Sequence, residues 1–581
     1  MAILGVDVGG TFTDAVLLTA GNELRTAKVP TARRQEQSVV AAARAVAVTG
    51  VERFAHGTTV ATNALLERKG AKTAFVATDG FEHLLHLRRQ NRAQLYRPCA
   101  DHPSPLVPLE RCHGVRERVD PDGVVVPLEL ESLPEIDAEA IAVCLLFSFR
   151  DPSHEREVAD ELRRRLPGRR VVASHEIAPE FREYERASTT VIDAYLGPVA
   201  ARYLEQLGAA ARGAGLPEPL VMRSSGGVAT LAEATAHPAL ALISGPAAGV
   251  AGARLLARMA GFEKAISFDM GGTSTDVCLI AGGRAELTSE REVGGFPLRL
   301  PMVDLHTVGA GGGSLVSVDP GGGVRVGPES AGADPGPACY GRGGRRPTVT
   351  DANLLLGRLP ERLAGGLELD VAAALRAFEG LDPAAAIEIV NAEMLRALRV
   401  VSVERGHDPR DFALVAFGGA GPLHACALAD ELEIGTVLVP AAAGVLSALG
   451  LVASDERRDR VVSHVRPLRE VDSLPREGTA DLRYRGQSFE LSIPIQDGLE
   501  EAFHRAHEER YGTSDRDREV ELVAVRTAQT TPGPTIHLPP AGKPLHVGGP
   551  AVVELDGATC FVAPGWAGER DGVGTLVLTR A

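Results

Sequence analysis

The sequence predicts an α/β protein of two or three domains, followed by a smaller and mostly β region. Three observations favour this class. A chain of 581 residues is too long for one hydrophobic core. Apolar runs typical of strands alternate with helical stretches over most of its length. A glycine turn near the N-terminus occurs again near the middle, which indicates two related halves.

The repeated stretch reads VDVGGTFTD at 6–14 and FDMGGTSTD at 268–276, and the two copies agree at six of nine positions. A chain this rich in glycine gives roughly one such match by chance, so the flanking residues decide. Both copies lie between two short apolar runs, and each continues through a polar turn into a third run. This shared context predicts a three-stranded meander in each half.

The residue types of the repeat suit a nucleotide phosphate. Glycines let the backbone approach an anion and turn several N–H groups toward it, and threonine hydroxyls can donate further bonds. Asp7 and Asp269 would hold Mg²⁺ or its waters between the phosphates. The alternative is an ordinary tight hairpin with Gly for positive φ and Asp as a turn cap. The candidate phosphate-binding residues are Gly9, Gly10, Thr11, Thr13 and Asp14 in the first copy, and Gly271, Gly272, Thr273 and Thr275 in the second.

We expect residues 1–190 to form the first lobe. Besides the hairpin, it should contain a helix over Thr59–Arg68 and strands over Thr73–Thr78 and Ile141–Phe147. The segment 97–135 is rich in Pro, Asp and Val, so we expect it to be irregular, as an insertion near the cleft.

The second lobe is expected over residues 191–459. Asp382 is typical of a helix N-cap and Pro383 of a first turn, and apolar residues follow at helical spacing as far as Val401. A strand at 412–417, a glycine turn and a helix at 422–432 form an α/β crossover, although the turn does not complete G-x-G-x-x-G. No G-x-x-x-x-G-K-[ST] loop occurs.

Residues 460–581 are expected to form the mostly β region. Strand-like alternation occurs in LRYRGQSFELSIPI (482–495) and GPAVVELDGATCFVAPGW (549–566), around one amphipathic helix at Leu499–Tyr511.

Two D-x-G-G-T-x-T-D hairpins in successive halves resemble the phosphate loops of the actin, hexokinase and Hsp70 ATPase superfamily, in which two ribonuclease-H-like lobes clamp ATP. Other stretches, in order along nearly the whole chain, resemble the large subunit of the hydantoinase A and 5-oxoprolinase family. These stretches are AHGTTVATNALLERKGA (55–71), REYERASTTVIDAYL (182–196), MRSSGG (222–227), ISGPAAGV (243–250), DLHTVGAGGGS (304–314) and GPESAGADPGPACYGRGG (327–344).

The resemblance implies two actin-like lobes around a nucleotide cleft and ATP-dependent hydrolysis of a cyclic amide such as a hydantoin, 5-oxoproline or another lactam. The γ-phosphoryl group would be transferred to the amide carbonyl oxygen. ATP and Mg²⁺ would be required, with Asp7 and Asp269 as catalytic and metal-binding residues. A B-type hydantoinase subunit and an oligomer are expected. The alternatives are an ATP-dependent carboxylase subunit that activates a ketone or bicarbonate, and a non-enzymatic ATP-driven clamp.

Two further glycine-rich stretches are candidates for binding the nucleotide. Gly245 lies where an apolar run enters a helix, whose N-terminus favours an anion. Gly418, Gly419 and Gly421 resemble the superfamily's adenosine motif. A helix start and a tight strand-to-helix turn explain the same residues without a ligand.

Candidate substrate contacts come from two other motifs. They are His56, Thr58, Thr59 and Asn63 in the first, and Asp304 and His306 before the glycine run at 309–313 in the second. Helix capping and a satisfied structural histidine are the alternatives. We interpret the pair His83 and His86 as a solvated helix face, and Cys339 as a packing residue.

Composition excludes several classes of protein. A net charge of −15 without a basic run argues against nonspecific nucleic-acid binding. The sequence contains no run of about 18 apolar residues, which a membrane span would need. No basic or apolar leader opens the chain, so we expect a cytoplasmic protein. Seven cysteines without a C-x-x-C pair are expected to be reduced thiols.

Overall fold

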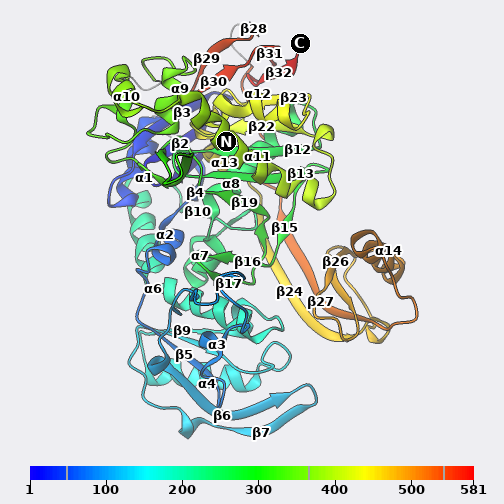
Figure 1. Ribbon diagram of the computed structural model, residues 1–581. Helices are drawn as coiled ribbons and strands as arrows, with labels where there is room; N and C mark the ends of the chain where they lie inside the picture. The colour runs from blue at the N-terminus through cyan, green and yellow to red at the C-terminus, as the bar shows by residue number, and fades with distance from the viewer. Residues whose placement is uncertain (47–49, 364–366, 541–543) are drawn as a thin grey trace.

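The structure is a computed structural model that describes residues 1–46, 50–363, 367–540 and 544–581. Two large sheets make up its upper body (Figure 1). Each sheet contains one predicted meander, and the register is the same in both: Asp7 pairs with Asp14, and Asp269 with Asp276. The meander strands are β1 (Ala2–Val8), β2 (Phe12–Leu18) and β3 (Leu24–Pro30) in the first sheet, and β12 (Ala265–Met270), β13 (Thr275–Ala281) and β14 (Arg284–Ala285) in the second.

Parallel strands extend each meander in the same order. In the first sheet, β4 (Val51–Gly57) pairs with β1 and β10 (Leu220–Met222) pairs with β4. In the second, β22 (Ala413–Phe417) pairs with β12 and β23 (Thr436–Val439) pairs with β22. Every residue of β22 is buried, as expected of a parallel strand covered on both faces. The repeat is therefore one fold built twice, as the predicted fold class requires, although β10 lies in the first sheet and within the range expected for the second lobe.

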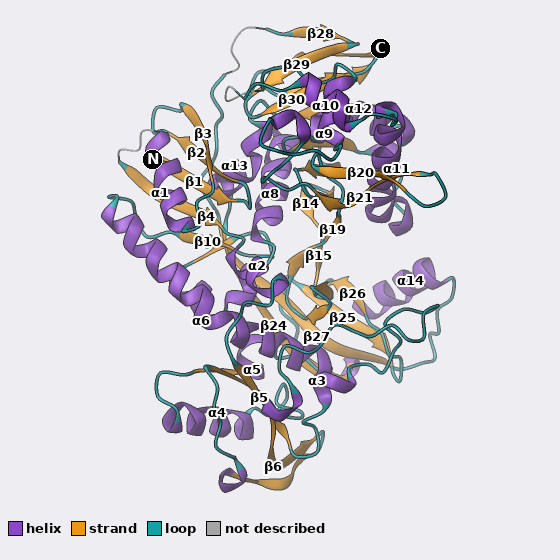
Figure 2. Cartoon of the chain, turned by 60° about the vertical axis from the view of Figure 1, so that its left-hand side comes forward, coloured by secondary structure: helices purple, strands orange, loops and turns teal. Residues whose placement is uncertain are grey.

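Helices fill three layers around these sheets. Between them lie α8 (Ser244–Met259) and α13 (Leu446–Ala453) (Figure 2), packed so closely that a Cβ on Gly450 would lie 1.9 Å from the Ala248 carbonyl oxygen. On the outer faces, α1 (Gln35–Ala45) covers the first sheet, and α11 (Pro383–Val401) and α12 (Gly421–Glu431) cover the second.

Helix α11 begins where its sequence predicts. The Asp382 carboxylate caps it by accepting a hydrogen bond from the Ala384 amide at 2.9 Å. Its predicted apolar stripe, which includes Val390, Met394 and Val401, is fully buried. The helix therefore contributes one face to the core, as its spacing indicates.

A separate five-stranded sheet forms the lower unit, in the order β7-β6-β5-β8-β9. The segment predicted to be irregular, 97–135, supplies two of its strands, so that prediction is wrong for residues 112–129. These strands lie at the far end of the lower unit in Figure 1, and polar exposed positions conceal their alternating burial. The strands are β5 (Thr73–Thr78), β6 (Cys112–Asp120), β7 (Gly123–Glu129), β8 (Ala140–Cys144) and β9 (Arg170–Ala173).

One long helix joins the lower unit to the upper body. Helix α6 (Glu183–Gly213) has 31 residues, which corresponds to roughly 46 Å at the usual rise per residue. In Figure 2 it runs diagonally along the outside of the molecule. Helix α2 (Val60–Leu66) lies against it and begins directly after the last residues of β4.

The C-terminal residues add strands to both large sheets. In the first sheet, β24 (Glu456–Pro467) joins β11 (Val228–Ala229), and β27 (Val520–Thr531) follows it. In the second, β32 (Leu576–Arg580) pairs with β23. The expected boundary at residue 460 therefore does not coincide with a boundary between sheets. The other C-terminal elements are β25 (Thr479–Tyr484), β26 (Leu491–Pro494), the predicted helix α14 (Leu499–Tyr511), β28 (His546–Gly548), β29 (Ala551–Leu555), β30 (Ala558–Val562) and β31 (Trp566–Arg570).

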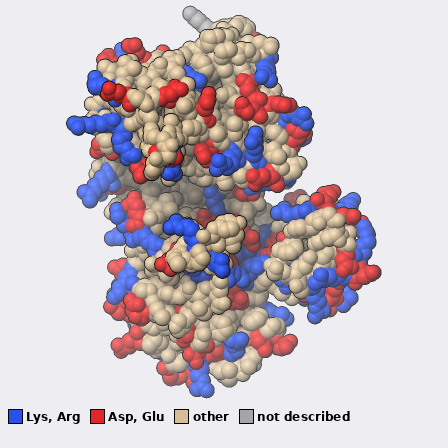
Figure 3. Space-filling view, in the orientation of Figure 1, with Lys and Arg blue, Asp and Glu red and all other residues tan. Residues whose placement is uncertain are grey.

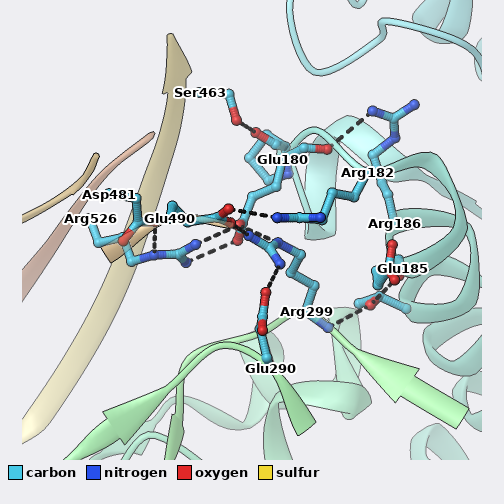
Figure 4. Close-up of polar contacts among 12 residues, drawn as sticks. Glu180, Arg182, Glu185, Arg186, Glu290, Arg299, Ser463, Asp481, Glu490 and Arg526 are labelled. Carbon is cyan, nitrogen blue, oxygen red and sulfur yellow. Dashed lines mark hydrogen bonds and ion pairs between the residues drawn. The ribbon is translucent and has the colours of Figure 1, made fainter. Parts of the chain in front are cut away.

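The elements β25, β26 and α14, with the outer ends of β24 and β27, form an arm that projects from the side of the molecule (Figure 1 and Figure 3). A buried ion network joins it to the rest of the chain (Figure 4). The Glu180 carboxylate accepts hydrogen bonds from Arg299 Nε at 2.9 Å and Arg526 Nη1 at 3.0 Å. Glu490 accepts from Arg299 at 2.7 Å and from Arg182 at 2.6 Å. Every charge in the network has an opposite partner, as burial requires.

The shorter elements complete the fold. They are α3 (Leu84–Leu87), α4 (Ser153–Arg165), α5 (Ser174–Ile177), α7 (Leu231–Ala236), α9 (Val349–Leu355), α10 (Val371–Ala377), β15 (Leu287–Thr288), β16 (Arg291–Val293), β17 (Phe296–Leu298), β18 (Met302–Val303), β19 (Leu305–Val308), β20 (Ser314–Val318) and β21 (Val324–Ser330).

Candidate active site

The two glycine hairpins bring four aspartates into one electrostatic group. Burial, followed by the charge of Asp14, raises the pKa of Asp7 to about 7. Burial, followed by the charges of Asp276 and Asp7, raises the pKa of Asp269 to about 8. Asp7 and Asp269 come from different lobes, so their interaction places the two carboxylates near each other across the cleft. Such carboxylates gain most from a bound cation.

Each of these two aspartates lies against a glycine at the end of the neighbouring parallel strand. A Cβ on Gly57 would lie 2.3 Å from Asp7 Oδ1, and a Cβ on Gly418 would lie 2.3 Å from Asp269 Oδ1. Gly57 ends β4 and pairs with Asp7, whereas Gly418 directly follows Phe417, the residue of β22 that pairs with Asp269, so the two glycines differ by one position in register. Glycine at both leaves room for the carboxylates. The sequence motifs did not assign this role to Gly57.

The N-terminus of α8 also faces Asp7. A Cβ on Gly245 would lie 3.7 Å from both carboxylate oxygens of Asp7. Ile243, directly before the helix, has φ 54°, which is unusual for a β-branched residue, and its amide donates to Thr62 Oγ1 at 3.1 Å. The strained turn thus directs the helix start, with its unpaired amides, toward the aspartate.

The threonines of the two hairpins divide into two kinds. Thr11 and Thr273, with Gly10 and Gly272, are exposed at the tips. Thr13 and Thr275 are fully buried: the Thr13 hydroxyl lies 3.0 Å from that of Thr31, and the Thr275 hydroxyl donates to the Ala310 carbonyl at 2.6 Å. The inner hydroxyls therefore hold the hairpins in shape, and the tip residues face outward.

Neighbouring protein groups donate hydrogen bonds to carbonyl groups of both hairpins. The Thr31 hydroxyl donates to the Gly9 carbonyl at 2.9 Å. In the second lobe, the amides of Gly312 and Gly313 donate to the carbonyls of Gly271 and Gly272 at 2.9 and 2.7 Å. Protein groups therefore hold these carbonyls and fix the conformation of both hairpins.

The turn at 418–421 lies beside the second hairpin. The Ala420 amide donates to the Met270 carbonyl at 2.9 Å, and a Cβ on Gly421 would lie 3.3 Å from the Phe268 carbonyl oxygen. Both contacts are with the end of β12, which carries Asp269. The turn that contains Gly418, Gly419 and Gly421 therefore packs against the end of the strand that carries Asp269.

Asp14 and Asp276 form the second pair of carboxylates. Burial raises the pKa of both. Lys28 Nζ lies 2.7 Å from Asp14 Oδ1, and the Thr307 hydroxyl donates to Asp276 Oδ1 at 2.5 Å. Asp276 was missing from the residues predicted for the site, although it ends the second copy of the repeat just as Asp14 ends the first.

His56 has a structural role in this geometry. It is fully buried, and burial lowers its pKa to about 4, so the ring is neutral at physiological pH. Nδ1 lies 3.0 Å from the Val6 carbonyl oxygen and Nε2 lies 2.8 Å from the Tyr203 hydroxyl. Nδ1–H therefore donates to Val6 and Nε2 accepts from Tyr203. The ring holds β4 against β1 at the residue before Gly57.

Other predicted substrate residues differ in how they are engaged. The Ser244 hydroxyl donates to the Thr58 carbonyl at 2.8 Å, which joins the end of β4 to the start of α8. Thr59 and Asn63 are half-buried around the first turn of α2. Asp304 forms an ion pair with Arg405 at 2.5 Å. His306 lies on β19, where burial lowers its pKa. The contacts of the described residues link neither Asp304 nor His306 to Asp7 or Asp269.

The donor set fits Mg²⁺ held together with a nucleotide. The described residues contain no group of three or more His, Cys, Asp or Glu side chains that could hold a metal by themselves. Mg²⁺ usually takes one or two protein carboxylates and keeps phosphate oxygens and waters as its other ligands. Asp7 Oδ1 is buried without a hydrogen-bond partner, as a carboxylate oxygen reserved for a cation would be.

Three further observations concern Cys339, the helices and the surface charge. Cys339 is fully buried, and burial raises the pKa of its thiol, as a packing residue requires. Within the described ranges, no helix combines the length and apolar character needed to cross a bilayer. The face in Figure 3 mixes acidic and basic side chains.

Known proteins share this organisation. The family models described as Hydantoinase/oxoprolinase N-terminal region and Hydantoinase/oxoprolinase match residues 3–166 and 186–460. Uncharacterized protein MJ0964 of Methanocaldococcus jannaschii is 39% identical over 90% of this chain and 86% of its own. The caprolactamase subunit alpha of Pseudomonas jessenii is 32% identical over 99% of both chains. The acetophenone carboxylase gamma subunit of Aromatoleum aromaticum is 34% identical over 77% of this chain and 67% of its own.

A solved structure extends the likeness to three dimensions. The crystal structure of the ATP-dependent caprolactamase from Pseudomonas jessenii aligns over 100% of both chains, with a TM-score of 0.89 and 31% identity. The family models, the relatives and this structure agree with the two-lobed geometry and its hairpins. The chain belongs to the hydantoinase/oxoprolinase family.

Proposed function

We propose that this chain catalyses the ATP-dependent step in the hydrolysis of a cyclic amide. The observation that carries the proposal is the pair of hairpins with the same register, which place Asp7 and Asp269 at matching positions of the two lobes, each with a glycine packed against its carboxylate. This arrangement is suited to gripping a triphosphate between two lobes. The relative that aligns over its full length is a caprolactamase subunit, and caprolactam is a cyclic amide.

The chemistry follows from the weakness of amides as electrophiles. Transfer of the γ-phosphoryl group forms a bond from phosphorus to the amide carbonyl oxygen and breaks the bond to the β-phosphate, which releases ADP. Loss of the ring N–H proton leaves an O-phosphorylated imidate, whose ring carbon water can attack. The protein's contribution is mostly positioning and charge neutralisation.

Different residues of this chain would bind the phosphates, the adenosine, the Mg²⁺ and the substrate. The tip amides of both hairpins, with Thr11 and Thr273, would bind the phosphates, and the turn that contains Gly419 would receive the adenosine. Asp7 and Asp269 would hold Mg²⁺, which neutralises charge on the phosphate oxygens when bound. Of the residues predicted to contact the substrate, we assign that role to Thr59 and Asn63, which are half-buried around the first turn of α2.

A second candidate function is carboxylation of a ketone. The acetophenone carboxylase gamma subunit is also a relative, and the same phosphoryl transfer would activate a ketone or bicarbonate. The two reactions differ in the molecule that accepts the phosphoryl group, whereas the hairpins would bind the ATP in both. A clamp that responds to unfolded peptide ranks third.

We further propose that the chain works with a B-type subunit in a cytoplasmic heteromer. Two of the relatives are named as subunits, the caprolactamase subunit alpha and the acetophenone carboxylase gamma subunit, which supports a partner subunit. All seven cysteines are unpaired, as expected in a reducing compartment.

One experiment separates these functions. ATP hydrolysis by the chain, with and without the product of a neighbouring gene, is measured against lactams, hydantoins and 5-oxoproline, and against ketones with bicarbonate. Stimulation by a cyclic amide without bicarbonate supports the first proposal. Stimulation only by a ketone with bicarbonate supports the second, and stimulation only by unfolded peptide supports the clamp.

A further inference from the structure

Three residues form a row across the first meander. Asp7 pairs with Asp14 between β1 and β2, and Asp14 pairs with Lys28 between β2 and β3. Side chains in register on adjacent strands project from the same face of a sheet, and the strands lie about 4.8 Å apart. The Lys28 ammonium therefore extends from the face that carries Asp7, two strands away. Its bond to Asp14 fixes it there.

Lys28 also contacts the second lobe. Its Nζ donates to the Gly444 carbonyl at 2.9 Å. The preceding carbonyl, that of Ala443, accepts a hydrogen bond from the Gly418 amide at 3.0 Å, and Gly418 is the glycine behind Asp269. The ammonium thus lies where the two lobes meet. Burial and neighbouring carboxylates raise the pKa of Asp7 and of Asp269, and the positive charge of Lys28 partly opposes that rise in both, which agrees with its position.

The matching row in the second lobe has no ammonium. Asp269 pairs with Asp276, and Asp276 pairs with Thr307. Thr307 occupies the position equivalent to Lys28 and contributes a hydroxyl. The nearby Arg291 donates to Thr307 Oγ1 at 3.3 Å and to the Leu305 carbonyl at 3.1 Å, so protein groups already hold its guanidinium. The two lobes share their aspartates but differ in this one charge.

We infer that Lys28 binds the terminal phosphoryl group of ATP. This inference rests on the proposed ATP-dependent function and adds a residue to it. A lysine ammonium has three N–H donors, and its contacts with Asp14 and Gly444 use two. A third of the Lys28 side chain is exposed, so a phosphate oxygen can reach the remaining donor. Four carboxylates surround this cleft, and the ammonium offsets their repulsion of a triphosphate.

The position of Lys28 makes it specific for the end of the triphosphate. The adenosine would bind at the turn 418–421, whereas Lys28 lies in one row with Asp7, which would hold Mg²⁺ at the outer phosphates. A nucleotide bound to that turn would need its outer phosphates to reach Lys28. Adenosine monophosphate would make the adenosine contacts without reaching the ammonium.

Calorimetric titration of the full-length chain tests this inference. The ligands are Mg²⁺ with a non-hydrolysable ATP analogue, and AMP. The variants are Lys28→Met, which removes the charge, Lys28→Arg, which keeps it, and Arg25→Met as a matched control. Arg25 is on the same strand and pairs with Glu23 on the surface. We expect Lys28→Met to weaken the triphosphate analogue about tenfold or more and to change AMP affinity by less than about twofold.

The outcomes separate this inference from the proposed function. Lys28→Arg should recover most of the lost triphosphate affinity, and Arg25→Met should match the wild type. Equal triphosphate affinity in Lys28→Met and wild type would overturn the inference while leaving the proposed function in place. Equal loss of AMP and triphosphate binding would also overturn it. A wild-type chain that binds neither nucleotide would overturn both. Lys28→Gln replaces Lys28→Met if the latter does not fold.

Discussion

Replacing Gly57 with alanine tests whether the position of the Asp7 carboxylate controls activity. The new Cβ would lie 2.3 Å from Asp7 Oδ1, whereas ordinary contact between such atoms requires about 3.4 Å. The carboxylate must therefore move by roughly 1 Å. Gly57 has a backbone conformation open to alanine, since its φ is not positive, so the clash is the main effect. Gly418 is a poorer target because its φ of 78° adds backbone strain.

The expected cost falls on catalysis more than on folding. Overpacking of this kind costs about 1–3 kcal/mol, which lowers the melting temperature by only a few degrees in a chain of this size. A displacement of about 1 Å at a reacting centre can reduce kcat about 100-fold. We expect Gly57→Ala to remain folded and to lose roughly that factor in substrate-stimulated ATP hydrolysis.

The assay compares kcat and the melting curve of three proteins: wild type, Gly57→Ala and Gly435→Ala. Gly435 is the matched control because a Cβ there meets no atom within 4 Å and its φ is not positive. The control should retain the wild-type kcat. Gly57→Ala with the wild-type kcat would refute the role given to Asp7.

Three further predictions follow from the same structure. The pKa values of Asp7 and Asp269 are raised to about 7 and about 8, so protons compete with Mg²⁺ for both carboxylates. The apparent Mg²⁺ dissociation constant for nucleotide-dependent binding should therefore be about 100-fold higher at pH 6.5 than at pH 8.5. Asp7→Asn should reduce this factor to about 25, and a pH-independent constant would contradict both ligands. Glu180→Ala leaves Arg299 and Arg526 without their shared partner and should cost about 3–5 kcal/mol of unfolding free energy, measured by denaturant titration, whereas the exposed-pair control Glu329→Ala should change it by less than about 1 kcal/mol. Under native conditions a maleimide should label Cys99, the exposed cysteine, and mass spectrometry should find Cys339 unmodified; rapid labelling of Cys339 would disprove its packing role.

Local signals explain why much of the fold could be predicted. The meanders, α11 and α14 depend on contacts between residues close in sequence, such as the Asp382 cap and the apolar spacing after it. Pairing between distant segments carries no such signal. The addition of β24 to the first sheet and β32 to the second depends on contacts formed only in the folded chain.

The site residues also divide into those with a local sequence signal and those that depend on contacts between distant segments. The repeat identified Asp7 and Asp269, and it also contained Asp276, which comparison of the two copies could have supplied. The role of Gly57 depends on a neighbour 50 residues earlier in the chain, so no local motif contains it. The burial of Thr13 and Thr275 depends on which side of the hairpin each faces. His56 was predicted as a substrate contact because the family resemblance places its motif near the cleft, but its partners are Val6 and Tyr203.

The most direct test of the central claim is single-turnover phosphoryl transfer from [γ-³²P]ATP in the presence of a lactam and the partner subunit. The account predicts ADP formation that depends on the lactam and on Mg²⁺, and that Asp269→Ala abolishes without unfolding the chain. Undiminished, lactam-dependent turnover by a folded Asp269→Ala variant would contradict the assignment of the two hairpins as the ATP site.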